Sequence, residues 1–212
     1  MPIRVAQVMG KMLGGGVESV VMNYYRHIDR SKVQFDFLVD ADSTRVPEEE
    51  IKALGGRVFR IPPYQHPLRY RKELVRLFHE EHWPIVHSHI NTLSVFPLSA
   101  AKKAGVPVRI AHSHSTMGKG EFAKNLMKLA LRPLSNLYPT ECFACSEYAG
   151  KWLFGMEIRT PNGEKLAIRT GFYRTWQVFT GGMGWDIPIW SWYRLYKSYQ
   201  ASTAGELPWD ID

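Results

Sequence analysis

The sequence predicts an α/β fold, a doubly wound parallel sheet over residues 1–155 followed by an aromatic-rich tail over residues 156–212. Three observations support this prediction. Apolar, β-branched runs alternate with amphipathic stretches as far as residue 155, as in an open parallel sheet covered by helices. Glycines stand where these helices would end. The chain of 212 residues is long enough for one well-packed domain with an appendage, but crowded for two domains.

Six short apolar runs predict the strands. They lie at residues 3–8, 35–39, 57–61, 85–88, 108–112 and 142–144. Between them, apolar residues spaced three and four apart predict six helices. These lie at residues 18–28, 48–54, 70–81, 93–104, 122–131 and 149–154. Six strand–helix units form a doubly wound domain, so its ligands are expected beyond the carboxyl ends of the strands.

The tail over residues 156–212 has a different composition. It holds five of the seven tryptophans and none of the eight histidines. An Asn-Gly pair between two alternating segments predicts a hairpin at residues 157–170, and Pro188 in the aromatic run that follows excludes one uninterrupted helix. We therefore expect a domain at residues 1–155 and a tail of unassigned fold that is not a complete second domain.

Charge is unevenly distributed along the chain. The formal net charge is +7, and residues 1–155 hold 21 Lys and Arg against 14 Asp and Glu, while the tail holds 6 of each. This excess predicts an anionic partner such as a phosphate, a nucleotide or a lipid surface. Because the basic residues are scattered over the predicted helices, no nucleic acid is expected. No apolar run approaches the roughly 18 residues of a membrane span, and no secretory signal opens the chain, which indicates a cytoplasmic protein.

Three consecutive glycines, residues 14–16, lie between the first strand and the first helix in the segment GKMLGGGVES. A glycine turn that leads into a helix points backbone N–H groups and the positive end of the helix at whatever lies above it. It therefore suits a phosphate, although the segment has neither the G-x-G-x-x-G pattern nor the Gly-Lys-Ser/Thr of a phosphate-binding loop. A flexible turn without a ligand is the alternative.

Two His-Ser-His triplets end the fourth and fifth strands, with histidines at positions 87 and 89 and at positions 112 and 114. Residues two apart on a strand point to one face, so the four imidazoles are expected at one edge of the sheet. A ligand-binding or catalytic role is favoured over a structural one. A zinc site is disfavoured, because no Asp, Glu or Cys with a matching spacing joins them and the strands would have to converge tightly. No metal is therefore expected.

Four segments of the chain carry a resemblance to a known family. They are IRVAQVMGKMLGGGVESVVMNYYRHIDRSKVQFDFLV, IKALGGRVFRIP, IVHSHINTLSVFPLSAAKKAGVPVRIAHSHS and FACSEYAGKWLFG. In order and without large gaps, they resemble the N-terminal domain of bacterial family-4 glycosyltransferases of the two-Rossmann-domain (GT-B) architecture, above all those of exopolysaccharide and capsule biosynthesis. The resemblance implies a Rossmann-like fold and transfer of a sugar from a nucleotide-sugar donor to a saccharide or lipid-linked acceptor in cell-surface polysaccharide synthesis. The nucleotide sugar is a substrate, so no cofactor is expected.

The glycine turn matches a Gly-Gly-x-Glu turn of that family at Gly15, Gly16 and Glu18. In the family, the backbone amides of this turn lie against the donor diphosphate or the acceptor. The resemblance therefore implies that these three residues bind the donor or the acceptor.

The resemblance also assigns roles at the strand ends. His114 matches best the histidine that closes the fifth strand and faces the transferred sugar, and His112 is the alternative; both are candidate catalytic residues. His89 and Asn91, after the fourth strand, are expected to face the cleft and bind donor or acceptor. The reaction implied is a retaining hexosyl transfer without an evident protein nucleophile, in which the site positions the partners and stabilises the departing diphosphate.

Residues 119–132 predict a basic amphipathic helix. Its apolar stripe and its lysines are Phe122, Leu126, Leu129 and Ala130, and Lys119, Lys124 and Lys128. Such a helix can lie on an anionic membrane, where a lipid-linked acceptor would be found, and would give the protein a peripheral contact at the inner face of the membrane. The alternative is that the apolar stripe packs on the sheet.

Members of the family continue into a second Rossmann-like domain, which holds most of the donor site. Residues 156–212 are too few to fold into that domain, although Pro161-Asn162-Gly163 resembles its opening. We therefore expect a truncated or rearranged gene product, a half whose donor domain comes from a second chain, or a chain with a replaced tail. Two functions stay open: a glycosyltransferase or half of one, and a non-catalytic acceptor- or partner-binding module left by loss of the donor domain.

Overall fold

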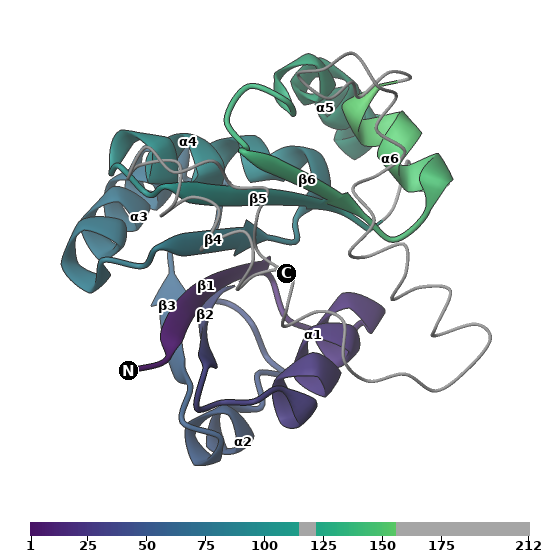
Figure 1. Ribbon diagram of the computed structural model, residues 1–212. Helices are drawn as coiled ribbons and strands as arrows, with labels where there is room; N and C mark the ends of the chain where they lie inside the picture. Colours follow the sequence, from purple (N-terminus) through teal and green to yellow (C-terminus); the bar gives the residue numbers. More distant parts are fainter. Residues whose placement is uncertain (115–121, 156–212) are drawn as a thin grey trace, which may run out of the picture.

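The computed structural model describes residues 1–114 and 122–155. Six parallel strands form one sheet in the order β3-β2-β1-β4-β5-β6 (Figure 1). The strands are β1 (Ile3–Gly10), β2 (Val33–Asp40), β3 (Arg57–Ile61), β4 (Ile85–Ser88), β5 (Val108–Ser113) and β6 (Glu141–Ala144). The helices are α1 (Gly16–His27), α2 (Glu48–Ala53), α3 (Pro67–Glu81), α4 (Val95–Lys103), α5 (Phe122–Leu131) and α6 (Glu147–Phe154), with 3₁₀ turns η1 (Asn91–Ser94) and η2 (Arg132–Leu134). The predicted Rossmann-like, doubly wound parallel sheet is confirmed.

All twelve predicted elements are present, and the differences lie at their ends. Helix α1 begins at Gly16 rather than at residue 18, and α3 begins at Pro67 rather than at residue 70. Proline is favoured in the first turn of a helix, where its missing N–H costs nothing. The fourth helix is preceded by the separate turn η1. The predicted hairpin at residues 157–170 and the rest of the tail lie outside the described residues.

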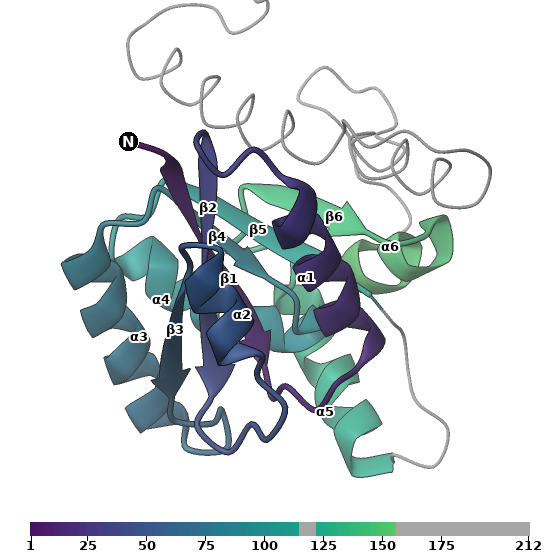
Figure 2. The same cartoon turned by 90° about the horizontal axis from the view of Figure 1, so that it is seen from below.

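Each face of the sheet is covered by a different set of helices. On one face, Val21, Met22 and Tyr25 of α1 and Ile51 of α2 pack on a cluster that includes Phe35. The opposite face carries α3, α4 and α6, whose buried residues include Leu74, Phe78, Leu98 and Leu153. Figure 2 looks onto the face that α1 and α2 cover. Burial of both faces explains why the strands are nearly continuous apolar runs.

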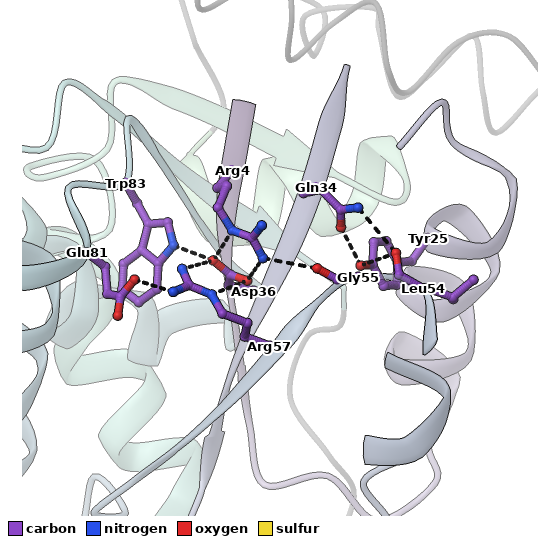
Figure 3. A network of polar contacts seen from close by, with 9 residues as sticks. All are labelled: Arg4, Tyr25, Gln34, Asp36, Leu54, Gly55, Arg57, Glu81 and Trp83. Atoms are coloured by element: carbon purple, nitrogen blue, oxygen red, sulfur yellow. Dashed lines mark hydrogen bonds and ion pairs between the residues drawn. The ribbon is translucent and has the colours of Figure 1, made fainter. Parts of the chain in front are cut away.

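One buried carboxylate ties three neighbouring strands together (Figure 3). Asp36 of β2 is fully buried and accepts hydrogen bonds from Arg4 Nε at 2.8 Å, Arg57 Nη2 at 2.6 Å and Trp83 Nε1 at 2.7 Å. Burial raises the pKa of Asp36, but these hydrogen bonds outweigh burial and hold its pKa below the usual value. The network therefore fixes β1 and β3 on either side of β2, and explains a charged residue inside an apolar strand.

The strand order places the topological switch point between β1 and β4. The strands after β1 continue to one side, as β2 and β3, and the strands after β4 to the other, as β5 and β6. The helix that follows β1 covers one face and the helix that follows β4 covers the other. In doubly wound sheets the ligand crevice lies at this point, beyond the carboxyl ends of the strands.

Helix α5 keeps much of its apolar surface exposed. Leu126 and Leu129 are 59% and 45% exposed, and Ala130 is exposed as well. The alternative that the apolar stripe packs on the sheet is therefore wrong for these residues, because their side chains face outward. Residues 119–121 and the side chains of residues 122–124 are outside the description. None of the helices in the described part of the chain is long and apolar enough to cross a membrane.

Candidate functional site

The turn between β1 and α1 needs glycine at two positions. Gly10 has φ +69° and Gly14 has φ +88°, both in the left-handed region that favours glycine. A Cβ on Gly10 would also lie 2.8 Å from Cγ2 of Ile90, so the end of β1 packs closely against the segment after β4. Gly15 and Gly16 have no such requirement. Apart from its chain neighbours and the backbone of its own helix, no heavy atom of the described residues lies within 4 Å of a Cβ placed on Gly16. The space beside Gly16 is therefore open.

The side chain of Glu18 caps the turn. Its carboxylate accepts hydrogen bonds from the N–H groups of Leu13 at 2.8 Å, of Gly14, and of Gly15 at 2.6 Å. Glu18 is the third residue of α1 and Gly15 is the N-cap, so the hydrogen bond from the Gly15 N–H to the Glu18 side chain is that of a capping box. The same carboxylate binds two further amides, those of Leu13 and Gly14. Of the amides of the glycine turn at residues 14–16, those of Gly14 and Gly15 are thus satisfied internally, together with the preceding amide of Leu13. An anion that used them would have to displace Glu18.

The two His-Ser-His triplets direct histidine and serine to opposite faces of the sheet. Strands β4 and β5 are parallel neighbours, with His87 opposite Ile110 and Ser88 opposite Ala111. Ser88 Oγ donates a hydrogen bond to Ser94 Oγ at 2.9 Å. On β5, Ser113 Oγ donates to a carbonyl of α6, also at 2.9 Å. The serines therefore attach the strands to the covering layer on one face, and the histidines gather beneath α1 on the other.

The four imidazoles lie in hydrogen-bond contact. His87 Nε2 is 3.0 Å from His112 Nδ1, and His89 Nδ1 is 2.9 Å from His114 Nε2. The rings of His112 and His114 stack with their centroids 3.8 Å apart. The four imidazoles therefore meet at one edge of the sheet, as expected. Neighbouring parallel strands lie about 4.8 Å apart, so tight convergence of the strands is no reason to disfavour a zinc site here.

Gln7 completes the cluster from β1, and sequence reasoning missed it. Its side chain is fully buried, and His89 Nε2 lies 2.8 Å from Gln7 Oε1. The available signal was a single uncharged polar residue in the middle of a buried apolar run. A small cavity of about 10 Å³, at the lower limit of the space that one water molecule needs, lies against Gln7, the four histidines and the α1 residues Val20, Val21 and Tyr24.

Burial keeps these histidines uncharged. Loss of solvation lowers the pKa of His87, His89 and His112 well below 6.5, and neighbouring imidazoles lower it further. The pKa of His114 falls to about 4 for the same reason, loss of solvation. At neutral pH each imidazole therefore has one N–H and one bare nitrogen, and can donate one hydrogen bond and accept one.

Three of the histidines are close enough to hold a metal ion. One ring nitrogen from each of His87, His89 and His112 lies within 4.8 Å of the others, and neutral imidazole is a common metal ligand. Ring nitrogens of these histidines are nevertheless hydrogen-bonded to each other, to His114 and to Gln7. A metal ion would have to break these hydrogen bonds, so the arrangement fits a hydrogen-bonded network better than a metal centre.

His114 and His112, the two candidates at the end of β5, differ in access. His112 is only 1% exposed, whereas His114 is partly buried just after the strand. The N–H of His114 donates to Asn91 Oδ1 at 2.7 Å, and its carbonyl accepts from Cys145 Sγ at 3.2 Å. Asn91, expected to face the cleft, thus holds the backbone of His114. Only His114 of the two has the access that contact with a ligand requires.

A family model described as "Glycosyl transferase 4-like domain" matches residues 15–161 of the chain. The protein EpsF of Bacillus subtilis (strain 168), which is named as a glycosyltransferase, is 42% identical over 178 residues. The match covers 78% of this chain and 46% of EpsF, so the chain spans about half the length of that relative.

Solved structures show the same fold at low identity. Alr3699/HepE of Anabaena, in complex with UDP-glucose, superposes with a TM-score of 0.53 at 13% identity, over 71% of this chain and 39% of that chain. A Listeria monocytogenes protein described as a UDP-N-acetylglucosamine 2-epimerase gives a TM-score of 0.51 at 11% identity, over 72% of this chain and 42% of that chain. The likeness to both concerns the fold alone.

Proposed function

The chain belongs to the glycosyl transferase 4-like family, and on this premise we propose that it forms the acceptor-side half of a glycosyltransferase of cell-surface polysaccharide synthesis. The donor is a nucleotide sugar, and the acceptor is a saccharide or a lipid-linked saccharide. A non-catalytic binding module is less well supported, because the family match runs through residues 15–161 and the 42% identical relative is named as a glycosyltransferase.

The observation that carries the proposal is the placement of His114 at the carboxyl end of β5. Its backbone is held by Asn91, its ring stacks on buried His112, and its imidazole is uncharged at neutral pH. An uncharged imidazole can accept a hydrogen bond or a proton from a hydroxyl group. In a retaining transfer the acceptor hydroxyl has to be held against the sugar while the diphosphate departs. Holding that hydroxyl is the role we assign to His114.

The donor diphosphate is assigned to the first turn of α1. The space beside Gly16 is open, and the first N–H groups of a helix have no partner within the helix. The positive end of the helix dipole favours an anion there. Because Glu18 already binds the amides of residues 13–15, its role is to shape the turn, and the diphosphate contacts fall to the start of α1 at Gly16.

A lipid-linked acceptor would be reached through α5 and the turn that follows it. This surface, which contains Lys128, carries exposed leucines at positions 126, 129, 134 and 137. Exposed apolar side chains together with a basic residue suit the interface of an anionic membrane. The proposal therefore includes a peripheral membrane contact through this surface.

The remainder of the donor site lies outside the described residues. The chain spans 46% of EpsF, so the proposal assigns the other wall of the donor site to residues beyond residue 155 or to a second chain. No cofactor or metal ion has a role in the proposed reaction.

The test is calorimetric titration of the full chain with a panel of uridine and guanosine diphosphate sugars. Saturable binding of one donor is expected. Gly16→Val should weaken that binding at least tenfold, or about 1.4 kcal/mol, because its side chain fills the open space beside the turn. His114→Ala should lower donor hydrolysis and sugar transfer but leave donor affinity nearly unchanged. His79→Ala, an exposed histidine of α3 on the opposite face, is the matched control.

Two outcomes would contradict the proposal. One is a folded protein that binds no member of the panel, alone or with a candidate partner chain. The other is donor binding that Gly16→Val leaves intact, which would place the diphosphate away from α1.

A further inference from the structure

We propose that Gln7 is a positioning residue that sets the tautomer of His114 through His89, so that His114 presents a bare Nδ1 as an acceptor. The use of that nitrogen by a substrate hydroxyl rests on the proposed function. The tautomer itself is a property of the folded chain and can be measured without any substrate.

The first step follows from the hydrogen bond between β1 and the end of β4. Gln7 Oε1 is a carbonyl oxygen and can only accept, so His89 Nε2, 2.8 Å away, has to carry the proton and donate. This contact lies in the interior, because Gln7 is fully buried and His89 is 5% exposed. The hydrogen bond to Gln7 Oε1 therefore holds the proton of His89 on Nε2.

The second step transfers the assignment to His114. Because His89 is uncharged and has its proton on Nε2, its Nδ1 carries a lone pair. His114 Nε2 lies 2.9 Å from this Nδ1, so His114 Nε2 has to donate. His114 is uncharged as well, which leaves its Nδ1 without a proton. Gln7 thus determines, through His89, which nitrogen of His114 is the acceptor.

The third step concerns the orientation of the His114 ring. The backbone N–H and carbonyl of His114 are held by Asn91 and Cys145, and the ring stacks on His112 at 3.8 Å between centroids. Within the described residues 1–114 and 122–155, no hydrogen bond uses His114 Nδ1. The ring is therefore held with one nitrogen engaged by the cluster and the other, Nδ1, without a hydrogen bond to any described residue.

Burial of the polar Gln7 side chain is unfavourable unless the residue has this role. Its Nε2 has no hydrogen-bond partner within the described part of the chain, and a buried polar group without a partner destabilises a fold. A leucine would fill the same position in the β1 core without that cost. What glutamine supplies, and leucine cannot, is the Oε1 acceptor that orients the proton of His89.

The test is the tautomeric state of the histidines in the ¹⁵N-labelled full chain at neutral pH. Two-bond ¹H–¹⁵N correlation spectra distinguish a protonated ring nitrogen from a bare one, and the signals are assigned by their loss in His89→Asn and His114→Asn. Both rings should have the proton on Nε2 and a bare Nδ1. A proton on Nδ1 of His114 would overturn the proposal, and this result needs no Gln7 variant to fold.

Gln7→Met then tests the cause. Without the Oε1 acceptor, either ring of the His89–His114 pair can donate, so signals of a protonated Nδ1 should appear on both rings. Gln34→Met is the matched control: Gln34 is also a largely buried glutamine whose Oε1 accepts a hydrogen bond, from Tyr25 Oη at 2.6 Å, but away from the histidines. It should leave the tautomers unchanged. If Gln7→Met, shown to be folded, keeps the wild-type tautomers of both rings, Gln7 does not set them.

Two further results separate this proposal from its alternatives. One equivalent of Zn²⁺ should leave the His89 and His114 signals in place, whereas a shift showing Zn²⁺ bound through His87, His89 and His112 would overturn the network. A bare His114 Nδ1 in a chain that binds no donor would support the network and contradict the proposed function. Donor binding by a chain with a protonated His114 Nδ1 would support the proposed function and contradict the network.

Discussion

The carboxylate of Glu18 lies 2.6 Å from the N–H of Gly15, and the same carboxylate also binds the N–H groups of Leu13 and Gly14. One side chain in the first turn of α1 therefore satisfies the turn that leads into the helix. A glycine-rich turn at a helix start is usually interpreted as a place for a phosphate. Here the protein supplies its own anion, the Glu18 carboxylate, so the turn is ordered without a ligand. The position of the turn that is left open is Gly16.

Glu18→Ala should lower the free energy of unfolding by about 1 kcal/mol, the usual effect of losing a helix cap. The measurement is urea unfolding at neutral pH. Glu49→Ala is the control, because Glu49 is also in the first turn of a helix, α2, but its side chain is 96% exposed. Equal effects of the two substitutions would show that the three hydrogen bonds to Glu18 add nothing beyond a charge near a helix start.

Gly14→Ala and Gly16→Ala should differ although the two glycines are almost adjacent. At Gly14 the φ of +88° costs a side chain about 1–2 kcal/mol, and the added Cβ would lie 3.2 Å from Cδ of Arg45. At Gly16 the helical backbone and open space accept alanine, which should leave the free energy of unfolding unchanged or raise it by up to about 1 kcal/mol. Thermal and urea unfolding of both variants measures this difference. Equal destabilisation by the two substitutions would contradict the prediction that only Gly14 of the two requires glycine.

The elements of this fold were predictable because their signals are local. Apolar runs predict strands such as β4, and three- and four-residue spacing predicts helices such as α3. The starts of α1 and α3 were predicted two and three residues late, because a capping side chain and a proline extend a helix beyond its apolar face.

The site was predictable in part. The histidines and the glycine turn were identified because the carboxyl ends of parallel strands meet at one edge. The hydrogen-bonded pairs among the histidines could not be predicted. The contact of His89 with His114 and with Gln7 depends on the strand order and on the register of β1, β4 and β5. Gln7 is 82 residues from His89 along the chain, and nothing local indicates the partner of a lone polar residue in an apolar strand.

Asp36→Asn should be strongly destabilising at neutral pH, by about 3 kcal/mol, because it removes the common partner of two guanidinium groups and an indole N–H. The pKa of Asp36 is held below its unfolded value, so the wild-type carboxylate stabilises the fold above that unfolded value. This stabilisation is lost as the pH falls through the folded pKa. Urea unfolding at a series of pH values should therefore show the difference between wild type and Asp36→Asn shrinking in acid. A difference that stays constant to pH 2.5 would contradict this account.

Asp40 at the end of β2 should show the opposite pH dependence. Burial, and then the charge of Asp42, raises the pKa of Asp40 to about 6, and its Oδ1 has no hydrogen-bond partner within the described residues. The folded state therefore binds a proton more tightly than the unfolded state, and ionisation of Asp40 lowers stability as the pH rises from about 4 to about 6.

Asp40→Asn removes this penalty. It should raise the free energy of unfolding by about 2 kcal/mol at pH 8 and have little effect at pH 4. Exposed Asp29, which precedes the other end of β2 and pairs with Lys32 at 3.4 Å, provides the control in Asp29→Asn, whose effect should stay nearly constant between pH 4 and pH 8. If Asp40→Asn destabilises the protein equally at both pH values, Asp40 is ionised in a favourable contact and burial does not raise its pKa.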